Sequence, residues 1–152
     1  MSDKQKSAEL ILKLYELRRD ETMRKARNWW ISFNPSSPQD ILATLSSEHS
    51  GYYRMVSTYW DMAAALVLHG AVDEQMFNDC NGEHMFVFAK IEPHLEGVRA
   101  VMGPNVLKSL EQLIARTEGS KERLAQIRDL SRKWAAARAE AERAKAQATP
   151  TA

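Results

Sequence analysis

The residues best suited to chemistry lie in one short segment. Asp79 to His84 reads D-C-N-G-E-H and holds two carboxylates, a thiol and an imidazole. The preceding segment, Tyr52 to Asp73, is almost free of charge, and before its final Asp73 it carries only Arg54 and Asp61, which lie seven residues apart. Charged side chains on such a helix must reach water or find partners, because an unpaired buried charge is costly. We therefore interpret five residues as a candidate ligand pocket: Arg54, Asp61, Asn81, Glu83 and His84. A plainer interpretation is also open, in which Gly82 serves helix packing and its polar neighbours cap helices.

Metal and nucleophile chemistry has little support in the sequence. Cys80 and His84 are four residues apart and could share a helix face, as a nucleophile and its base would. However, the chain has no repeated zinc-ligand spacing, no Glu-x-x-His motif of di-iron bundles and no glycine-rich phosphate loop. A Cys flanked by apolar residues on a helix is more often a packing residue. We expect no metal site, no cofactor and no catalytic residue.

The fold predicted around these residues is all-α. The segment Tyr52 to His69 is apolar on nearly every side, which is typical of a helix in the middle of a bundle. Gly70 follows it and can adopt the left-handed conformation that ends a helix. With only 6 Gly and 5 Pro in 152 residues, a turn-rich sheet protein is disfavoured. We expect about six helices in an irregular bundle around a central buried helix at about 52–69.

Breaks in the pattern mark the other helices. Apolar residues at helical spacing predict one long helix over 5–30, with i,i+4 pairs of Asp20 with Arg24 and Glu21 with Lys25. Ser37 is a suitable N-cap for a short helix that follows Pro38. Further boundaries are expected at five places: Asp73, Asn81-Gly82, Pro93, Gly103-Pro104 with Asn105 as the next cap, and the joint from Thr117 to Ser120.

Both ends of the chain carry surfaces suited to self-association. The segment Leu10–Leu17 is apolar on more than one side. Beyond Ser120, seven residues step by three and four and form a seam like that of a coiled coil: Ile127, Leu130, Trp134, Ala137, Ala141, Ala144 and Ala148. We expect a helical core domain over 1–119, a helical extension rich in Ala, Arg and Glu over 120–148, and a frayed tail at 149–152.

Composition and charge narrow the possible partners. The N-terminus has no signal-like apolar core, and the most apolar window, Met62 to Val72, is too short to cross a bilayer. With a single cysteine, Cys80, the chain fits a reducing compartment. We therefore expect a soluble, cytoplasmic protein without a membrane span. Residues 120–152 hold eight Lys/Arg and four Asp/Glu, and this interleaving argues against nucleic-acid binding.

The middle of the chain resembles a bacterial helical family that is known only as a domain of unknown function. The resemblance covers roughly residues 10–115 and rests on motifs along this range: Arg19-Asp20-Glu21, Trp29, Tyr59-Trp60-Asp61-Met62, Gly70-Ala71-Val72-Asp73-Glu74, Asn81-Gly82-Glu83, Pro93, Arg99 and Leu110-Glu111. Many members of that family carry an N-terminal membrane anchor, and none is expected here. The resemblance implies a helical fold and no activity.

These observations favour a non-enzymatic scaffold or interaction protein that self-associates, through the Leu10–Leu17 surface or through the seam at Ile127, Leu130 and Trp134. An alternative is a small-ligand sensor or cryptic enzyme that uses the polar pocket beside the central helix. A weaker alternative is contact between the basic C-terminal helix and an anionic partner.

Overall fold

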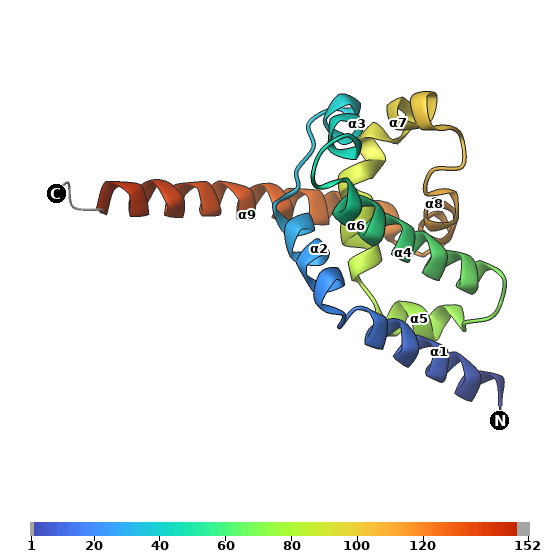
Figure 1. The fold of residues 1–152 in the computed structure, drawn as a ribbon. Helices are drawn as coiled ribbons and strands as arrows, with labels where there is room; N and C mark the ends of the chain where they lie inside the picture. Colours follow the sequence, from blue (N-terminus) through green and yellow to red (C-terminus); the bar gives the residue numbers. More distant parts are fainter. Residues whose placement is uncertain (1, 149–152) are drawn as a thin grey trace.

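The computed structural model describes residues 2–148, and this part of the chain is helical throughout apart from its turns (Figure 1). The prediction of an all-α fold is confirmed. The helices are α1 (Asp3–Leu17), α2 (Glu21–Ser32), α3 (Pro38–Leu45), α4 (Ser50–Leu68), α5 (Glu74–Cys80), α6 (Glu83–Ile91), a short 3-10 helix η1 (Glu92–His94), α7 (Leu95–Met102), α8 (Lys108–Ala115) and α9 (Ser120–Ala148).

Helix α4 is the central helix, as the sequence predicts. It packs against α2 and α8 and buries Trp60, Ala63 and Ala64 completely. The alanines allow neighbouring helices to approach closely, while Trp60 fills the space between them. The helix ends next to Gly70, whose φ of +78° is the left-handed conformation expected there.

The single helix expected over 5–30 is wrong, because the chain turns between α1 and α2. Asp20 is the reason for the break, since its carboxylate accepts a hydrogen bond from the backbone N–H of Met23 at 3.1 Å and thereby caps α2. This role replaces the expected Asp20–Arg24 pair. The expected pair of Glu21 with Lys25 is present, at 3.3 Å.

Two further helix boundaries have structural causes that the sequence does not identify. At Asn81-Gly82 the helix ends and restarts, giving α5 and α6. Helix α8 begins after Leu107, which has a φ of +52°, and Asn105 is not its cap. Instead Asp61 of α4 accepts a hydrogen bond from the N–H of Leu110 at 2.9 Å, so one helix caps another.

Helix α9 has a docked and a projecting part. Leu124 and Ile127 are buried, and Arg128 donates to the carbonyl of Ala89 at 3.4 Å. The rest of the helix extends away from the body (Figure 1). The tail predicted to fray, 149–152, lies outside the described residues. Within residues 2–148 no helix combines the length and apolarity needed to cross a bilayer.

A buried lysine joins α6 to the end of α2. Lys90 is 7 % exposed, and its ammonium donates to the carbonyls of Trp30 (2.7 Å), Ile31 (3.1 Å) and Phe33 (2.8 Å). Burial lowers the pKa of Lys90 to about 8, so the side chain is still mostly protonated at neutral pH. The positive charge therefore caps the negative end of the α2 dipole and satisfies its last carbonyls.

Replacing Lys90 with Met should lower the free energy of unfolding by about 2–3 kcal/mol, because the three carbonyls of α2 lose their donor inside the protein. Urea unfolding at neutral pH measures this change. Lys13, an exposed lysine on α1, provides the matched control, and Lys13→Met should stay within about 0.5 kcal/mol of the wild type. Equal effects of the two substitutions would contradict the role assigned to Lys90.

Candidate functional site

The five residues of the predicted pocket have different partners in the structure. Arg54 is exposed and its Nε donates to Ser50 on the same helix, at 3.3 Å. Asp61 caps α8, and the side-chain amide of Asn81 donates to the carbonyl of Phe77 at 3.0 Å. Glu83 and His84, at the start of α6, both contact Trp60 of the central helix. The structure thus brings two of the five together and places the other three in separate contacts, of which those of Arg54 and Asn81 are local and that of Asp61 joins α4 to α8.

Glu83 is the centre of a cluster that joins four helices. Its carboxylate accepts hydrogen bonds from two nitrogens of Arg27 of α2, from Nε at 2.9 and 3.1 Å and from Nη2 at 2.7 Å. It also accepts from the indole N–H of Trp60 on α4 at 3.3 Å, and it lies 3.6 Å from the guanidinium of Arg18, which follows α1. A bidentate arginine–carboxylate pair of this kind fixes geometry as well as charge.

The cluster stabilises its charges through mutual contact. Hydrogen bonding to Glu83 raises the pKa of Arg27, despite partial burial of the guanidinium. Arg18 lies over the ring of Trp60, with 5.3 Å between its guanidinium carbon and the ring centroid. Sequence reasoning missed both arginines. Each belongs to a highly charged stretch that looks like solvated helix surface, and no local signal marks a partner that is 56 residues away for Arg27.

His84 is a core residue in this structure. It is 1 % exposed, and its ring centroid lies 5.1 Å from that of Phe77 and 5.8 Å from that of Trp60. Neither ring nitrogen has a hydrogen-bond partner among the described residues. Burial lowers the pKa of His84 to about 4, which keeps the imidazole neutral at pH 7. Cys80, in contrast, is exposed at the end of α5. Because the chain breaks at Gly82, Cys80 and His84 lie on different helices and do not share one helix face.

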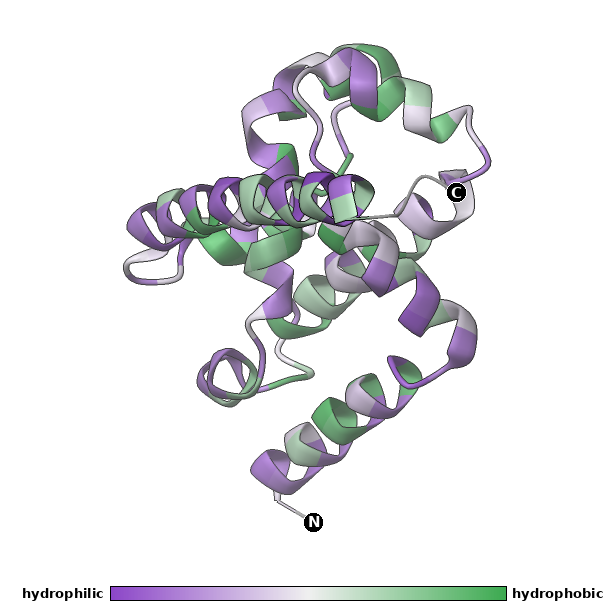
Figure 2. Ribbon diagram, turned by 90° about the vertical axis from the view of Figure 1, so that its left-hand side faces the viewer, coloured by the Kyte–Doolittle hydropathy of each residue, from purple (hydrophilic) through white to green (hydrophobic). Residues whose placement is uncertain are grey.

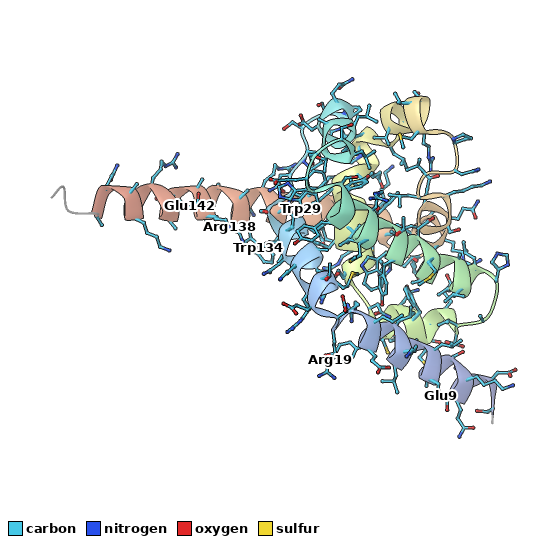
Figure 3. All side chains as sticks on the ribbon, in the orientation of Figure 1. Glu9, Arg19, Trp29, Trp134, Arg138 and Glu142 are labelled. Carbon is cyan, nitrogen blue, oxygen red and sulfur yellow. The ribbon has the colours of Figure 1, made fainter. Side chains whose placement is uncertain are left out.

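Beside the Glu83 cluster lies a cleft with a volume of about 820 Å³. Its walls come from α2, the start of α6 and α9, and they combine cationic residues with large apolar ones. They include Arg24, Arg27, Trp30, Ile31, Glu83, Phe86 and Trp134. A second cleft of about 550 Å³ shares Ile31, Phe86 and Trp134 with the first. Trp134 therefore stands between the two clefts, on the side of α9 that lies next to α2 (Figure 3).

In the range 2–148 no group of three or more His, Cys, Asp or Glu side chains is placed to hold a metal ion.

Comparison with known proteins places the chain in a family. A family model described as a domain of unknown function, DUF4760, matches residues 5–117. The chain belongs to the DUF4760 family. This confirms the resemblance to an uncharacterised helical family, which brings no activity with it. No curated protein and no solved structure matches the chain. The DUF4760 region includes the Glu83 cluster, whereas α9 and its Trp134 follow the matched residues.

The Glu83 cluster can be tested by removing its charge. Glu83→Gln should lower the free energy of unfolding by about 2 kcal/mol, because Arg18 and Arg27 lose their counter-ion while Arg18 stays largely buried. The solvent exposure of Glu83, 23 % of its side chain, limits the effect. Chemical unfolding at pH 7 provides the measurement, with Glu118→Gln on the surface as the control. An unchanged stability for Glu83→Gln would mean that the cluster does not hold the four helices together.

The buried imidazole of His84 should make the free energy of unfolding depend on pH. The folded-state pKa of about 4 lies below the ordinary value of 6.5, so the unfolded chain binds the proton more readily. The neutral imidazole therefore makes its full contribution to the free energy of unfolding above pH 6.5. This contribution, about 3 kcal/mol, is lost as the pH falls to 4.

The substitution His84→Leu should remove this acid-induced loss and stay within about 1 kcal/mol of the wild type at pH 7, because no hydrogen bond is broken. Unfolding free energies across this pH range measure the effect. His69→Gln, at an exposed histidine, should leave the wild-type profile intact. If the His84→Leu profile also matched the wild type, the acid sensitivity would have another source.

Proposed function

We propose that this DUF4760 protein is a non-enzymatic helical scaffold that acts in the cytoplasm and self-associates through α9. The observation that carries the proposal is the exposure of Trp134, at 56 %, on a helix that projects from the body (Figures 1 and 3). Large aromatic residues on a surface are typical of interaction sites, where they supply much of the binding energy.

The neighbourhood of Trp134 supports an interface. Leu130, one turn before it, is 46 % exposed, and Ile31 of α2 is also exposed beside it. The two clefts next to Trp134 offer concave surface on both sides of an apolar ridge. Ile127, the first residue of the expected seam, is buried against the body and contributes to docking within the chain. The part of the seam open to a partner, called the α9 seam below, consists of Leu130, Trp134, Ala137 and Ala141.

The outer face of α1 is a second surface for self-association. Leu12, Tyr15 and Leu17 are exposed there, while Leu14 faces the core and Tyr59 donates a hydrogen bond to the carbonyl of Leu14. Figure 2 shows apolar residues recurring among hydrophilic ones along this helix, close to the N-terminus. The two clefts described above adjoin α9 and not this face, and the α9 seam is for that reason the leading surface.

A second candidate function, from a different class, is the binding of a small ligand in the 820 Å³ cleft. Its volume lies within the range of about 300–1,000 Å³ typical of ligand sites. Arg24 makes no ion pair with any residue in 2–148 and would suit the acidic group of a partly apolar ligand. This candidate replaces the pocket of the sequence prediction with a different set of residues, of which only Glu83 is common to both.

Light scattering coupled to size-exclusion chromatography tests the leading proposal. The wild type should show a mass above that of one chain at high concentration. The double substitution Leu130→Ser/Trp134→Ser should shift it to the monomer, because it removes the apolar side chains of the α9 seam. Val101→Ser/Met102→Ser is a matched control, since both residues are large, apolar and exposed on α7.

The possible outcomes distinguish the α9 seam from the outer face of α1 as the interface. A wild-type monomer at every concentration would refute self-association altogether. An oligomer that survives the α9 substitutions but dissociates with Leu12→Ser/Leu17→Ser would move the interface to α1.

A further inference from the structure

We infer that two copies of the chain pair antiparallel through their α9 helices, with Trp134 of each helix opposite Ala137 of the other. This inference rests on the proposed self-association through α9 and specifies its geometry. In this arrangement the projecting half of a second copy's α9 covers the α9 seam and lies in the adjoining cleft.

Side-chain volume along the α9 seam favours the antiparallel direction. The seam begins with Leu130 and Trp134 and continues with Ala137 and Ala141. Antiparallel pairing places large residues against small ones, with Leu130 opposite the second copy's Ala141. Parallel pairing in register would instead stack Trp134 on its own copy and leave the alanines facing each other with a gap between them.

Charge selects the same direction. Lys133 and Glu140 each come one residue before a member of the seam, so both flank the seam on the same side, and both are exposed. In the proposed register Lys133 of each copy lies next to Glu140 of the other, which gives two attractive pairs. A parallel pair would bring Lys133 close to the second copy's Arg138, a repulsive contact.

Charge also fixes the register within the antiparallel arrangement. A shift of one heptad toward the C-terminus would place Glu140 against Glu140 and Arg138 against Arg138. A shift the other way would place Lys133 against Lys133. Both alternatives put like charges together, so the register with Trp134 opposite Ala137 is the one that the sequence of α9 favours.

The body of the molecule fits this arrangement. Trp134 forms part of the wall of the 820 Å³ cleft, so a helix paired on Trp134 continues toward α2 and α6. The segment that would enter, residues 142–148, has alanine at every second position from Ala144 and can lie close to these walls. Glu142 of the second copy would reach the side of the cleft that carries Arg24, a guanidinium unpaired within the described chain.

Charge reversal tests the direction of pairing. In the antiparallel dimer Lys133→Glu turns two attractive contacts into repulsive ones and should raise the dimer Kd about tenfold at low ionic strength. Glu140→Lys should do the same, and the double variant Lys133→Glu/Glu140→Lys should restore the wild-type Kd. In a parallel dimer Lys133→Glu would face Arg138 and would lower the Kd instead. Sedimentation equilibrium on the full chain measures each Kd.

The controls distinguish this inference from the function on which it rests. Lys121→Glu makes the same change of charge on the exposed side of the docked part of α9 and should leave the Kd unchanged. If Leu130→Ser/Trp134→Ser dissociates the oligomer while Lys133→Glu strengthens or does not affect it, self-association through α9 stands and antiparallel pairing is overturned. If the wild type is a monomer, both are overturned. High salt should reduce the difference between single and double variants, because exposed ion pairs are screened.

Discussion

The ion pair between Glu83 and Arg27 is the interaction on which the arrangement of the helices depends. The carboxylate sits at the first turn of α6, where a negative charge is also favoured by the helix dipole. From that position it holds α2 through Arg27, α4 through Trp60 and the end of α1 through Arg18. A partly buried ion pair contributes less to stability than its distances suggest, but it penalises every packing in which one partner is left alone. Its main effect is therefore to select one arrangement of the four elements.

The same constraint operates at Lys90, with the opposite charge. The end of α2 turns inward toward α6, where water cannot satisfy its last carbonyls, and the three N–H groups of the ammonium take the place of water. Both ends of α6 are thus fixed to α2, by Glu83 with Arg27 and by Lys90 with the carbonyls of Trp30, Ile31 and Phe33. Two walls of the cleft, α2 and α6, are consequently held together.

What the sequence predicts well follows from local patterns. The apolar surface of Tyr52 to His69 identifies the central helix, Ser37 marks the start of α3, and Gly70 marks the end of α4. These features depend on residues close together in the chain. The sequence also indicates that Asp61 must reach water or find a partner. It does not show which partner, because the N–H of Leu110 that donates to Asp61 is 49 residues away. Lys90 and Arg27 were missed for the same reason, since a charged residue on a helix ordinarily points to solvent.

The contrast between the polar residues and the apolar ones bears on function. In the body, the polar groups of Asp61, Glu83 and Lys90 make contacts between helices. On α9 the large side chains of Leu130 and Trp134 are exposed to solvent. The other residues of the projecting part are polar or have short side chains. Leu124 and Ile127 dock the helix, whereas Trp134 lies beyond them and keeps 56 % of its surface exposed. Under the proposed pairing, a second chain would cover Trp134, and the alanines that follow it at heptad spacing would provide the small surface against which such a tryptophan can pack.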